Sequence, residues 1–138
     1  MFYGNTFEAF ASSVDVLAYL NNLIMGRAFD EFHSMSQKDY LRLDKAGRFN
    51  SFLMNKAFSA LCVERDNRLR NASHHGAFQF DSSVQMIKYR VGKGGTGEEQ
   101  TLSYVSYLAR CTCLFLQAMT LLRAEILMCH VAGIRPPL

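Results

Sequence analysis

Apolar residues recur with the period of a helix along the first part of the chain. One stripe is interrupted by a single polar residue and consists of Phe7, Phe10, Val14, Leu17, Asn21, Ile24 and Ala28. Asn5 precedes the stripe, and Glu8 comes three residues after Asn5, as in a capping box. This pattern predicts a helix from about Thr6 to His33, which Gly26 weakens locally by about 1 kcal/mol relative to alanine.

A second helical stripe follows and consists of Leu43, Ala46, Phe49, Leu53, Ala57, Ala60 and Leu61. Ser36 and Asp39 form the capping pattern at its start. Beyond the stripe the chain carries charges of alternating sign, which is typical of a solvated helix face. Leu69 keeps one apolar anchor there, so we expect this helix to run from Gln37 towards Ser73.

The segment from Val84 to Leu102 has a different pattern. Ile87, Tyr89 and Val91 alternate with basic residues, as the two faces of a strand do. A glycine-rich stretch breaks the alternation, and a second short strand is expected between Glu98 and Leu102. The pattern predicts a β-hairpin over residues 84–102.

The last predicted helix runs from about Ser103 to Val131, and Gly133 follows it as a stop signal. Its apolar face includes Tyr104, Leu108, Cys111, Phe115, Ala118, Leu122 and Ile126. Charged residues leave only Cys111–Leu122 uncharged, which is shorter than the roughly 20 residues of a membrane-spanning helix. We therefore interpret it as a bundle helix, either central or shared with a second subunit, and we expect a homodimer without a membrane span.

These elements predict a mainly all-α fold: an antiparallel bundle of three to five helices with a small β-hairpin insertion, in a single domain over residues 1–138. With 138 residues, 49% of them hydrophobic, the chain can bury a core. The net charge of +3 permits an anionic partner. The start of the chain lacks the basic region of a secretory signal, which predicts a cytoplasmic protein with reduced thiols.

Two patterns suggest cofactors or metals only weakly. The stretch from Gly92 to Gly97 spells G-x-G-x-x-G, but a dinucleotide site needs a helix to open directly on the glycines and a parallel strand beyond it. We interpret the stretch as a hairpin tip. Cys111 and Cys113 lack zinc spacing and a second ligand pair, so we expect them, with Cys62 and Cys129, to be small buried side chains. No cofactor and no metal is predicted.

The residues from Arg70 to His75 carry the strongest chemical signal. Arginine binds phosphate oxygens in a bidentate manner, asparagine orients polar groups, and histidine transfers protons near neutral pH. On a regular helix Arg70 and His74 share one face, while Asn71 and His75 share the neighbouring one. Arg70 and His75 would be about 140° apart, so they converge only if the last turn unwinds or a second chain completes the site. The other interpretation is a solvated helix end, with Gly76 as the stop.

The pattern Arg-Asn-x-x-x-His near the end of a helix resembles the motif of the HEPN superfamily of small all-α domains. It falls on Arg70, Asn71 and His75, and His74 is an additional histidine at a variable position. Long amphipathic segments before and after the motif fit the resemblance, which covers nearly the whole chain as a pattern. Many members of this superfamily are metal-independent ribonucleases of toxin–antitoxin and other defence systems.

The resemblance implies that an RNA 2′-hydroxyl attacks the adjacent phosphorus and leaves a 2′,3′-cyclic phosphate. Arg70 would bind the phosphate, Asn71 would position it, and His75 would transfer protons, with His74 as a second candidate. RNA and a second copy of the chain are the implied partners, together with a cognate antitoxin such as a nucleotidyltransferase. The alternative is a non-catalytic HEPN-like module for dimerisation or for binding nucleic acid or nucleotides.

Basic residues near the motif and on the hairpin would extend a phosphate-binding track, although exposed ion pairing is the commoner role of such residues. The predicted RNA-binding residues are Arg65, Arg68, Lys88, Arg90 and Lys93. His33 and His130 lie near predicted helix ends, where histidines are commonly stabilised by the helix dipole and take no part in chemistry.

Overall fold

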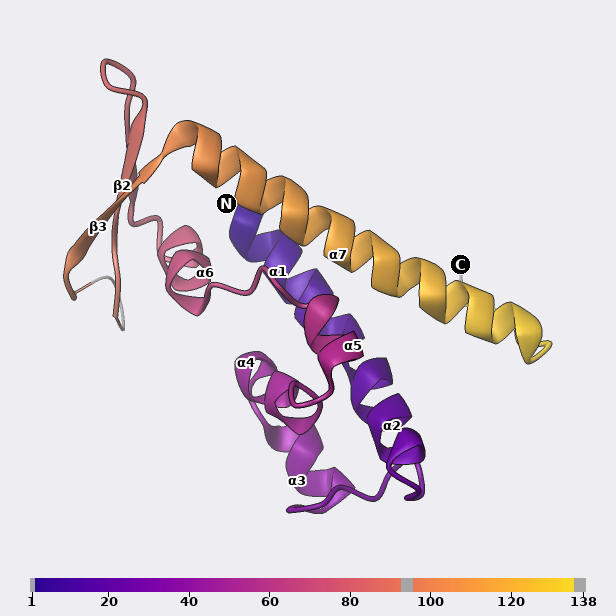
Figure 1. Ribbon diagram of the computed structural model, residues 1–138. Coiled ribbons are helices and arrows are strands. Elements are labelled where there is room, and N and C mark those ends of the chain that lie inside the picture. Colours follow the sequence, from indigo (N-terminus) through magenta and orange to yellow (C-terminus); the bar gives the residue numbers. More distant parts are fainter. Residues whose placement is uncertain (1, 93–95, 136–138) are drawn as a thin grey trace. The chain divides into compact units, whose positions relative to one another are not determined.

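The computed structural model describes residues 2–92 and 96–135, and it is mostly helical, with 58% of the residues in helices. This confirms the mainly-α prediction, whereas the arrangement as an antiparallel bundle stays a prediction. The helices are α1 (Phe2–Ser13), α2 (Asp15–Ile24), α3 (Gln37–Arg42), α4 (Lys45–Arg48), the 3₁₀ helix η1 (Phe49–Ser51), α5 (Lys56–Ala60), α6 (Asn67–His74) and α7 (Tyr104–Val131). The strands are β1 (Phe78–Asp81), β2 (Met86–Arg90) and β3 (Glu99–Ser103) (Figure 1).

The chain divides into two compact units. Unit 1 comprises residues 1–9 and 64–116, and unit 2 comprises residues 10–63 and 117–138. The predicted organisation as one domain stays a prediction. Because α6 and the sheet belong to unit 1, the residues of the Arg70–His75 motif are described within that unit.

The first predicted helix is wrong in extent. Helix α1 begins by Phe2, so Asn5 lies inside it and does not cap it. The helical hydrogen bonding is interrupted at Val14, and α2 then ends at Ile24. Gly26 follows with φ +75°, a left-handed conformation that a helix interior excludes. The glycine therefore ends the helix, and the chain up to His33 forms a loop.

The second predicted helix is also wrong, because the chain between Gln37 and Ser73 forms several short helices. Ser36 caps α3 as predicted, accepting a hydrogen bond from the backbone N–H of Asp39 at 3.1 Å. Three further side chains then cap new helices: Asp44 caps α4, Asn55 caps α5 and Asp66 caps α6. A side chain that bonds to nearby backbone N–H groups competes with continuation of the preceding helix, and this explains the breaks.

Aromatic packing stabilises the short helices of unit 2. Phe32 stacks on Tyr40 with ring centroids 4.2 Å apart, and Phe10 contacts Phe49 at 5.5 Å. The Tyr40 hydroxyl donates to Asp15 Oδ1 at 2.7 Å. Short helices are marginal by themselves in water, so these buried rings supply the stabilisation that helix length does not.

In unit 1, the predicted hairpin is present as β2 and β3, which pair antiparallel with Ile87 opposite Leu102. Strand β1 was not predicted and pairs with the other edge of β2. Ile87 and Tyr89 are buried while the basic residues of β2 lie on the opposite face, as the alternation predicted. Residues 93–95 of the glycine stretch, which was interpreted as a hairpin tip, lie outside the described residues. Among the described residues, the antiparallel strand β3 follows the stretch, rather than the helix and parallel strand of a dinucleotide motif.

Helix α7 begins and ends where the sequence predicted, within one residue. Gly133 has φ +69°, and the Ile134 N–H donates to the Cys129 carbonyl, as at a helix end closed by a left-handed glycine. Many large apolar side chains of α7 remain exposed. Within the described part of the chain, it is the one helix whose length and composition would suffice to cross a membrane, and 22% of its most apolar window is buried.

Candidate functional site

Helix α6 presents the Arg70–His75 motif from a fixed backbone. Asp66 Oδ1 accepts the N–H groups of Arg68 and Leu69 at 2.9 and 3.1 Å, which satisfies two of the free donors of the first turn. The Leu69 side chain is fully buried and anchors the helix to the core of unit 1. As a result, the neighbouring Arg70 lies half-buried, with 31% of its side chain exposed.

Glu8 of α1 is the carboxylate that contacts the motif. Its Oε1 accepts a hydrogen bond from Arg70 Nε at 2.6 Å and a second hydrogen bond from Arg70 Nη2. The same oxygen lies 3.5 Å from Nε2 of His74. The Arg70 guanidinium also lies over the ring of Phe7, 5.8 Å from its centroid. Glu8 thus connects the arginine and one histidine of the motif.

Sequence reasoning missed this role of Glu8, which it interpreted as a partner in a capping box. One signal was available: Glu8 is the only charged residue in α1, and its neighbours Phe7 and Phe10 are buried. A lone carboxylate beside buried residues usually has a polar partner. The spacing along the chain does not identify Arg70 as that partner.

Asn71 is positioned against the arginine. Its Oδ1 accepts a hydrogen bond from Arg70 Nη1 at 2.9 Å. Because Glu8 holds Nε and Nη2, the guanidinium is fixed from two sides. The structure therefore brings Arg70 and His74 to the same carboxylate, as their shared face on α6 predicted. Asn71, which the spacing placed with His75, contacts Arg70 instead, and Glu8 is added.

The two histidines of the motif have different surroundings. His74 is the last residue of α6, and its imidazole packs against Gly4. A side chain at position 4 would place its Cβ only 3.1 Å from His74 Nε2. Ser73 accepts a hydrogen bond from the Gly4 N–H at 3.1 Å, so α1 and the end of α6 are in direct contact. His75 caps the helix through its backbone N–H, and its exposed imidazole makes no hydrogen bond or ion pair with the described residues. The assignment of His75 as the proton-transfer group stays a prediction.

The stop signal after the motif is confirmed. Gly76 has φ +64°, and the Ala77 N–H donates to the Ala72 carbonyl at 3.0 Å, which closes the helix end. A cavity of about 210 Å³ begins at this point, and it is lined by Gly76, Ala77, Gln79, Lys88, Tyr89, Arg90 and Glu99. Two of the predicted RNA-binding residues, Lys88 and Arg90, therefore lie beside the end of α6, with the carboxylate of Glu99 in the same lining.

The remaining predicted RNA-binding residues are dispersed. Arg65 is exposed just before α6, and Arg68 is exposed in the first turn of α6. Lys93 lies outside the described residues. The structure thus places Arg65, Arg68, Lys88 and Arg90 in unit 1, and their use for RNA stays a prediction.

A second polar cluster holds α6 in place. Arg110 of α7 donates to Asp66 Oδ2 at 2.8 Å and lies 3.8 Å from Glu64. The Tyr3 hydroxyl donates to Glu64 at 2.5 Å and accepts the Asp66 N–H at 3.0 Å. Burial and the bond to Glu64 raise the pKa of Tyr3 well above its ordinary value. The phenol therefore stays neutral and connects α1 to the start of α6.

The cysteines match the description of buried side chains in part. Cys62 and Cys111 are buried, whereas Cys113 and Cys129 are half-buried, and all four are free thiols. Burial raises the pKa of the Cys111 thiol, which disfavours the reactive thiolate. Residues 2–92 and 96–135 contain no group of three His, Cys, Asp or Glu side chains arranged to hold a metal ion.

No protein-family model, no curated protein and no solved structure matches this chain. Because the helix predicted to run into the motif is divided into short helices, the resemblance to the HEPN superfamily depends on the motif and on its place at a helix end.

Proposed function

We propose that the chain is a HEPN-like, metal-independent endoribonuclease of a toxin–antitoxin or other defence system. The observation that carries the proposal is the convergence of Glu8, Arg70, Asn71 and His74 at the end of α6. A cation fixed by a carboxylate and an amide, with imidazoles on the same helix end, is suited to a phosphodiester. This cluster is only partly buried, so a phosphate has access to it.

The hydrogen bonds leave part of the arginine available to a substrate. A guanidinium has five N–H donors, of which Glu8 accepts two and Asn71 accepts one. The two that remain belong to Nη1 and Nη2, and we assign them to the phosphate. Arg70 would then stabilise the charge that develops on the phosphate oxygens, while Glu8 and Asn71 hold its orientation.

The chemical step transfers protons but needs no change in oxidation state. A base removes the proton of the RNA 2′-hydroxyl, whose oxygen forms a bond to the adjacent phosphorus. The bond from phosphorus to the 5′-oxygen breaks, and an acid protonates that oxygen. His75 is the proposed acid–base residue, and His74, next to Glu8, is the second candidate. The products are a 2′,3′-cyclic phosphate and a 5′-hydroxyl.

The proposed partners follow from the site, from α7 and from the resemblance to the HEPN superfamily. RNA is the substrate, and Arg65, Arg68, Lys88, Arg90 and Lys93 would contact its backbone. A second copy of the chain would pack on the exposed apolar side of α7 and bring a second motif to the same RNA. A nucleotidyltransferase antitoxin is a further partner in this proposal, and the cytoplasm is the proposed location.

The test is cleavage of RNA by the purified protein in EDTA, beside a DNA of matching sequence. We expect cleavage of the RNA alone, with cyclic phosphate ends. His75→Ala should lower the rate roughly 10²- to 10⁴-fold because a proton-transfer group is lost, whereas the control His130→Ala should not change it. Loss of activity on chelation, or wild-type activity of His75→Ala, would show that the motif has been misinterpreted.

One observation favours the alternative of a non-catalytic binding module. The charge of Arg70 is already paired with Glu8, as in a structural ion pair. On this alternative the protein binds nucleic acid or a partner without cleaving RNA under any condition. Arg70→Ala would then lower the free energy of unfolding, with no chemical activity to lose.

A further inference from the structure

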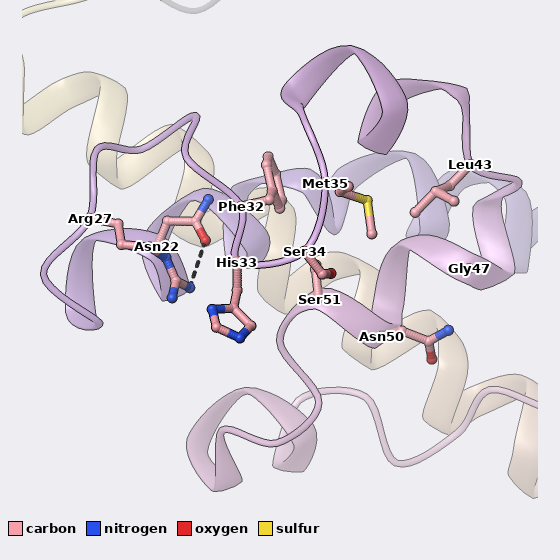
Figure 2. Close-up of a pocket in the computed structure, with 10 residues that line it drawn as sticks. All are labelled: Asn22, Arg27, Phe32, His33, Ser34, Met35, Leu43, Gly47, Asn50 and Ser51. Atoms are coloured by element: carbon pink, nitrogen blue, oxygen red, sulfur yellow. Dashed lines mark hydrogen bonds between the residues drawn. The ribbon is translucent and has the colours of Figure 1, made fainter.

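Unit 2 contains a cavity that the proposed function does not use. It has a volume of about 310 Å³, which is at the lower end of the range of small-molecule sites. Figure 2 shows the residues around it, which come from α2 and the turn after it, from the loop before α3, from the segment between α3 and the end of α4, and from η1. The lining consists of Asn22, Arg27, Phe32, His33, Ser34, Met35, Leu43, Gly47, Asn50 and Ser51.

Among the described residues, the lining contains a guanidinium, an imidazole and hydrogen-bonding groups but no carboxylate. Arg27 and His33 are accompanied by two serines and two asparagines. Arg27 forms no ion pair with any residue in the described part of the chain. Its Nε is buried and has no hydrogen-bond partner among those residues. A partly buried guanidinium without a counter-charge is costly, so this cavity is electrostatically suited to an anion.

A second arginine of unit 2, Arg48, differs from Arg27 because its charge is paired with a carboxylate. Arg48 also has a buried Nε without a partner, but its Nη1 donates to Asp15 Oδ2 at 2.8 Å. The charge of Arg48 is therefore neutralised inside the protein. Arg27 donates instead to a neutral amide, Asn22 Oδ1, at 3.2 Å.

The arginine is held in place before any ligand binds. Asn22 is 1% exposed, and its Nδ2 donates to the Phe29 carbonyl at 2.8 Å. The backbone N–H of Arg27 donates to the Asn22 carbonyl at 3.0 Å, and Gly26 turns the chain after α2. A preorganised cation loses little conformational entropy on binding, which favours affinity for a small ligand.

Arg27 and His33 also line a second cavity of unit 2, of about 480 Å³, together with Asn21, Met25, Met54 and Asn55. Arg27 and His33 are therefore common to both cavities, and Figure 2 shows them beside Asn22 in the first. The apolar part of the first lining is provided by Phe32, Met35 and Leu43. This combination suits a molecule with one charged end and one apolar body.

We propose that this cavity binds a small organic anion whose carboxylate or phosphate group contacts Arg27 and His33. Its compact apolar or aromatic body packs on Phe32, Met35 and Leu43. Asn50 and the two serines donate or accept the remaining hydrogen bonds. The site is independent of ribonuclease activity, because its residues belong to unit 2.

The test uses benzoate and phenyl phosphate as probes, with benzyl alcohol as the neutral control and inorganic phosphate as the head group alone. Binding is followed by amide chemical shifts in the full-length protein, with Gly47 and Asn50 as local reporters. Both aromatic anions should shift these signals in a saturable manner. Benzyl alcohol and inorganic phosphate should bind at least about tenfold more weakly, because each lacks one half of the interaction.

Three variants make the test specific. Arg27→Gln should weaken phenyl phosphate about tenfold or more. Ser34→Asp places a negative charge in the lining at a residue without a described side-chain hydrogen bond, and should also weaken it. Arg42→Gln removes an exposed arginine of the same unit that is not in the lining, and should leave binding unchanged. The proposal is overturned if the anions do not shift the reporters, if benzyl alcohol binds equally well, or if a folded Ser34→Asp protein binds as the wild type does.

Discussion

At the scale of single residues, Arg70 is shared between the protein and its proposed substrate. The carboxylate of Glu8 and the amide of Asn71 fix its orientation, and the Phe7 ring covers one side. Both charged side chains are about one third exposed, so solvent screens their attraction. We therefore propose that Glu8 positions Arg70 and that their ion pair contributes little to the free energy of unfolding.

This assignment predicts the effect of Glu8→Gln, which keeps the shape of the side chain and removes its charge. RNA cleavage should fall roughly 10- to 100-fold, because the guanidinium is less well oriented towards the phosphate. RNA binding should be retained or strengthened, because Arg70 is no longer neutralised. Initial cleavage rates and binding at two salt concentrations would measure both effects.

The control for this substitution is Glu31→Gln, which changes an exposed glutamate of unit 2 and should alter neither property. Wild-type cleavage by Glu8→Gln would remove Glu8 from the proposed site. Unchanged binding together with slower cleavage would still agree with a positioning role.

The candidate site was predictable from sequence only where its residues are neighbours on one helix. Arg70 and His74 are four positions apart, so helical geometry places them on one face, whereas the contact of Asn71 with its neighbour Arg70 depends on the side-chain conformations. Glu8 is 62 positions from Arg70, and no local spacing rule connects the two. The sequence motif also favoured His75, which lies at the exposed helix end, over His74, which is the histidine that faces Glu8.

At the scale of elements, end signals determined where prediction succeeded. Helix α7 was predicted because its apolar repeat is long and a glycine closes it. The helix predicted over residues 37–73 failed because Asp44, Asn55 and Asp66 each start a new helix. In a sequence such residues are compatible with an exposed helix face, and only the tertiary packing around them shows that they act as caps.

The role of Asp66 as a cap leads to a prediction about stability. Asp66→Ala removes the acceptor for two backbone N–H groups and should lower the free energy of unfolding by about 1 kcal/mol or more. Asp66→Asn should lower it less, because asparagine is also a good cap. Denaturant unfolding would measure both, with Asp30→Ala as an exposed aspartate control.

The difference between the two substitutions separates two contributions of this residue. Asp66 also accepts a hydrogen bond from Arg110, and asparagine loses the charge of that pair. If Asp66→Ala and Asp66→Asn lower the free energy of unfolding equally, Asp66 stabilises the protein mainly through its pair with Arg110 and not as a helix cap. If neither variant differs from the Asp30 control, Asp66 does not fix the start of α6.

At the scale of the whole molecule, α7 has a row of apolar side chains that stay exposed among the described residues. Leu108, Phe115, Met119, Leu122 and Ile126 are each between 39 and 46% exposed. They follow one another at intervals of seven, four, three and four residues, close to the spacing of a coiled-coil seam. The stripe extends over about 27 Å at 1.5 Å per residue. A second copy with the same stripe is the occupant that we propose.

The wild-type protein should therefore sediment at equilibrium as a dimer, with twice the chain mass of 15.7 kDa, at micromolar concentration. Leu122→Glu and Met119→Glu place a carboxylate on the stripe and should shift the equilibrium to the monomer, because burying an unpaired charge is costly. The matched control is Leu127→Glu, which alters an exposed leucine of the same helix away from the stripe.

The outcomes of this experiment also bear on the proposed ribonuclease. A monomeric mass for the wild type would contradict the dimer and would remove the second copy that brings another motif to the RNA. Flotation of the wild-type protein with lipid vesicles, lost in Leu122→Glu, would assign the stripe to a membrane instead. If the monomeric Leu122→Glu protein is folded but cleaves RNA much more slowly, the two motifs act together, since Leu122 lies on α7 and the motif lies on α6.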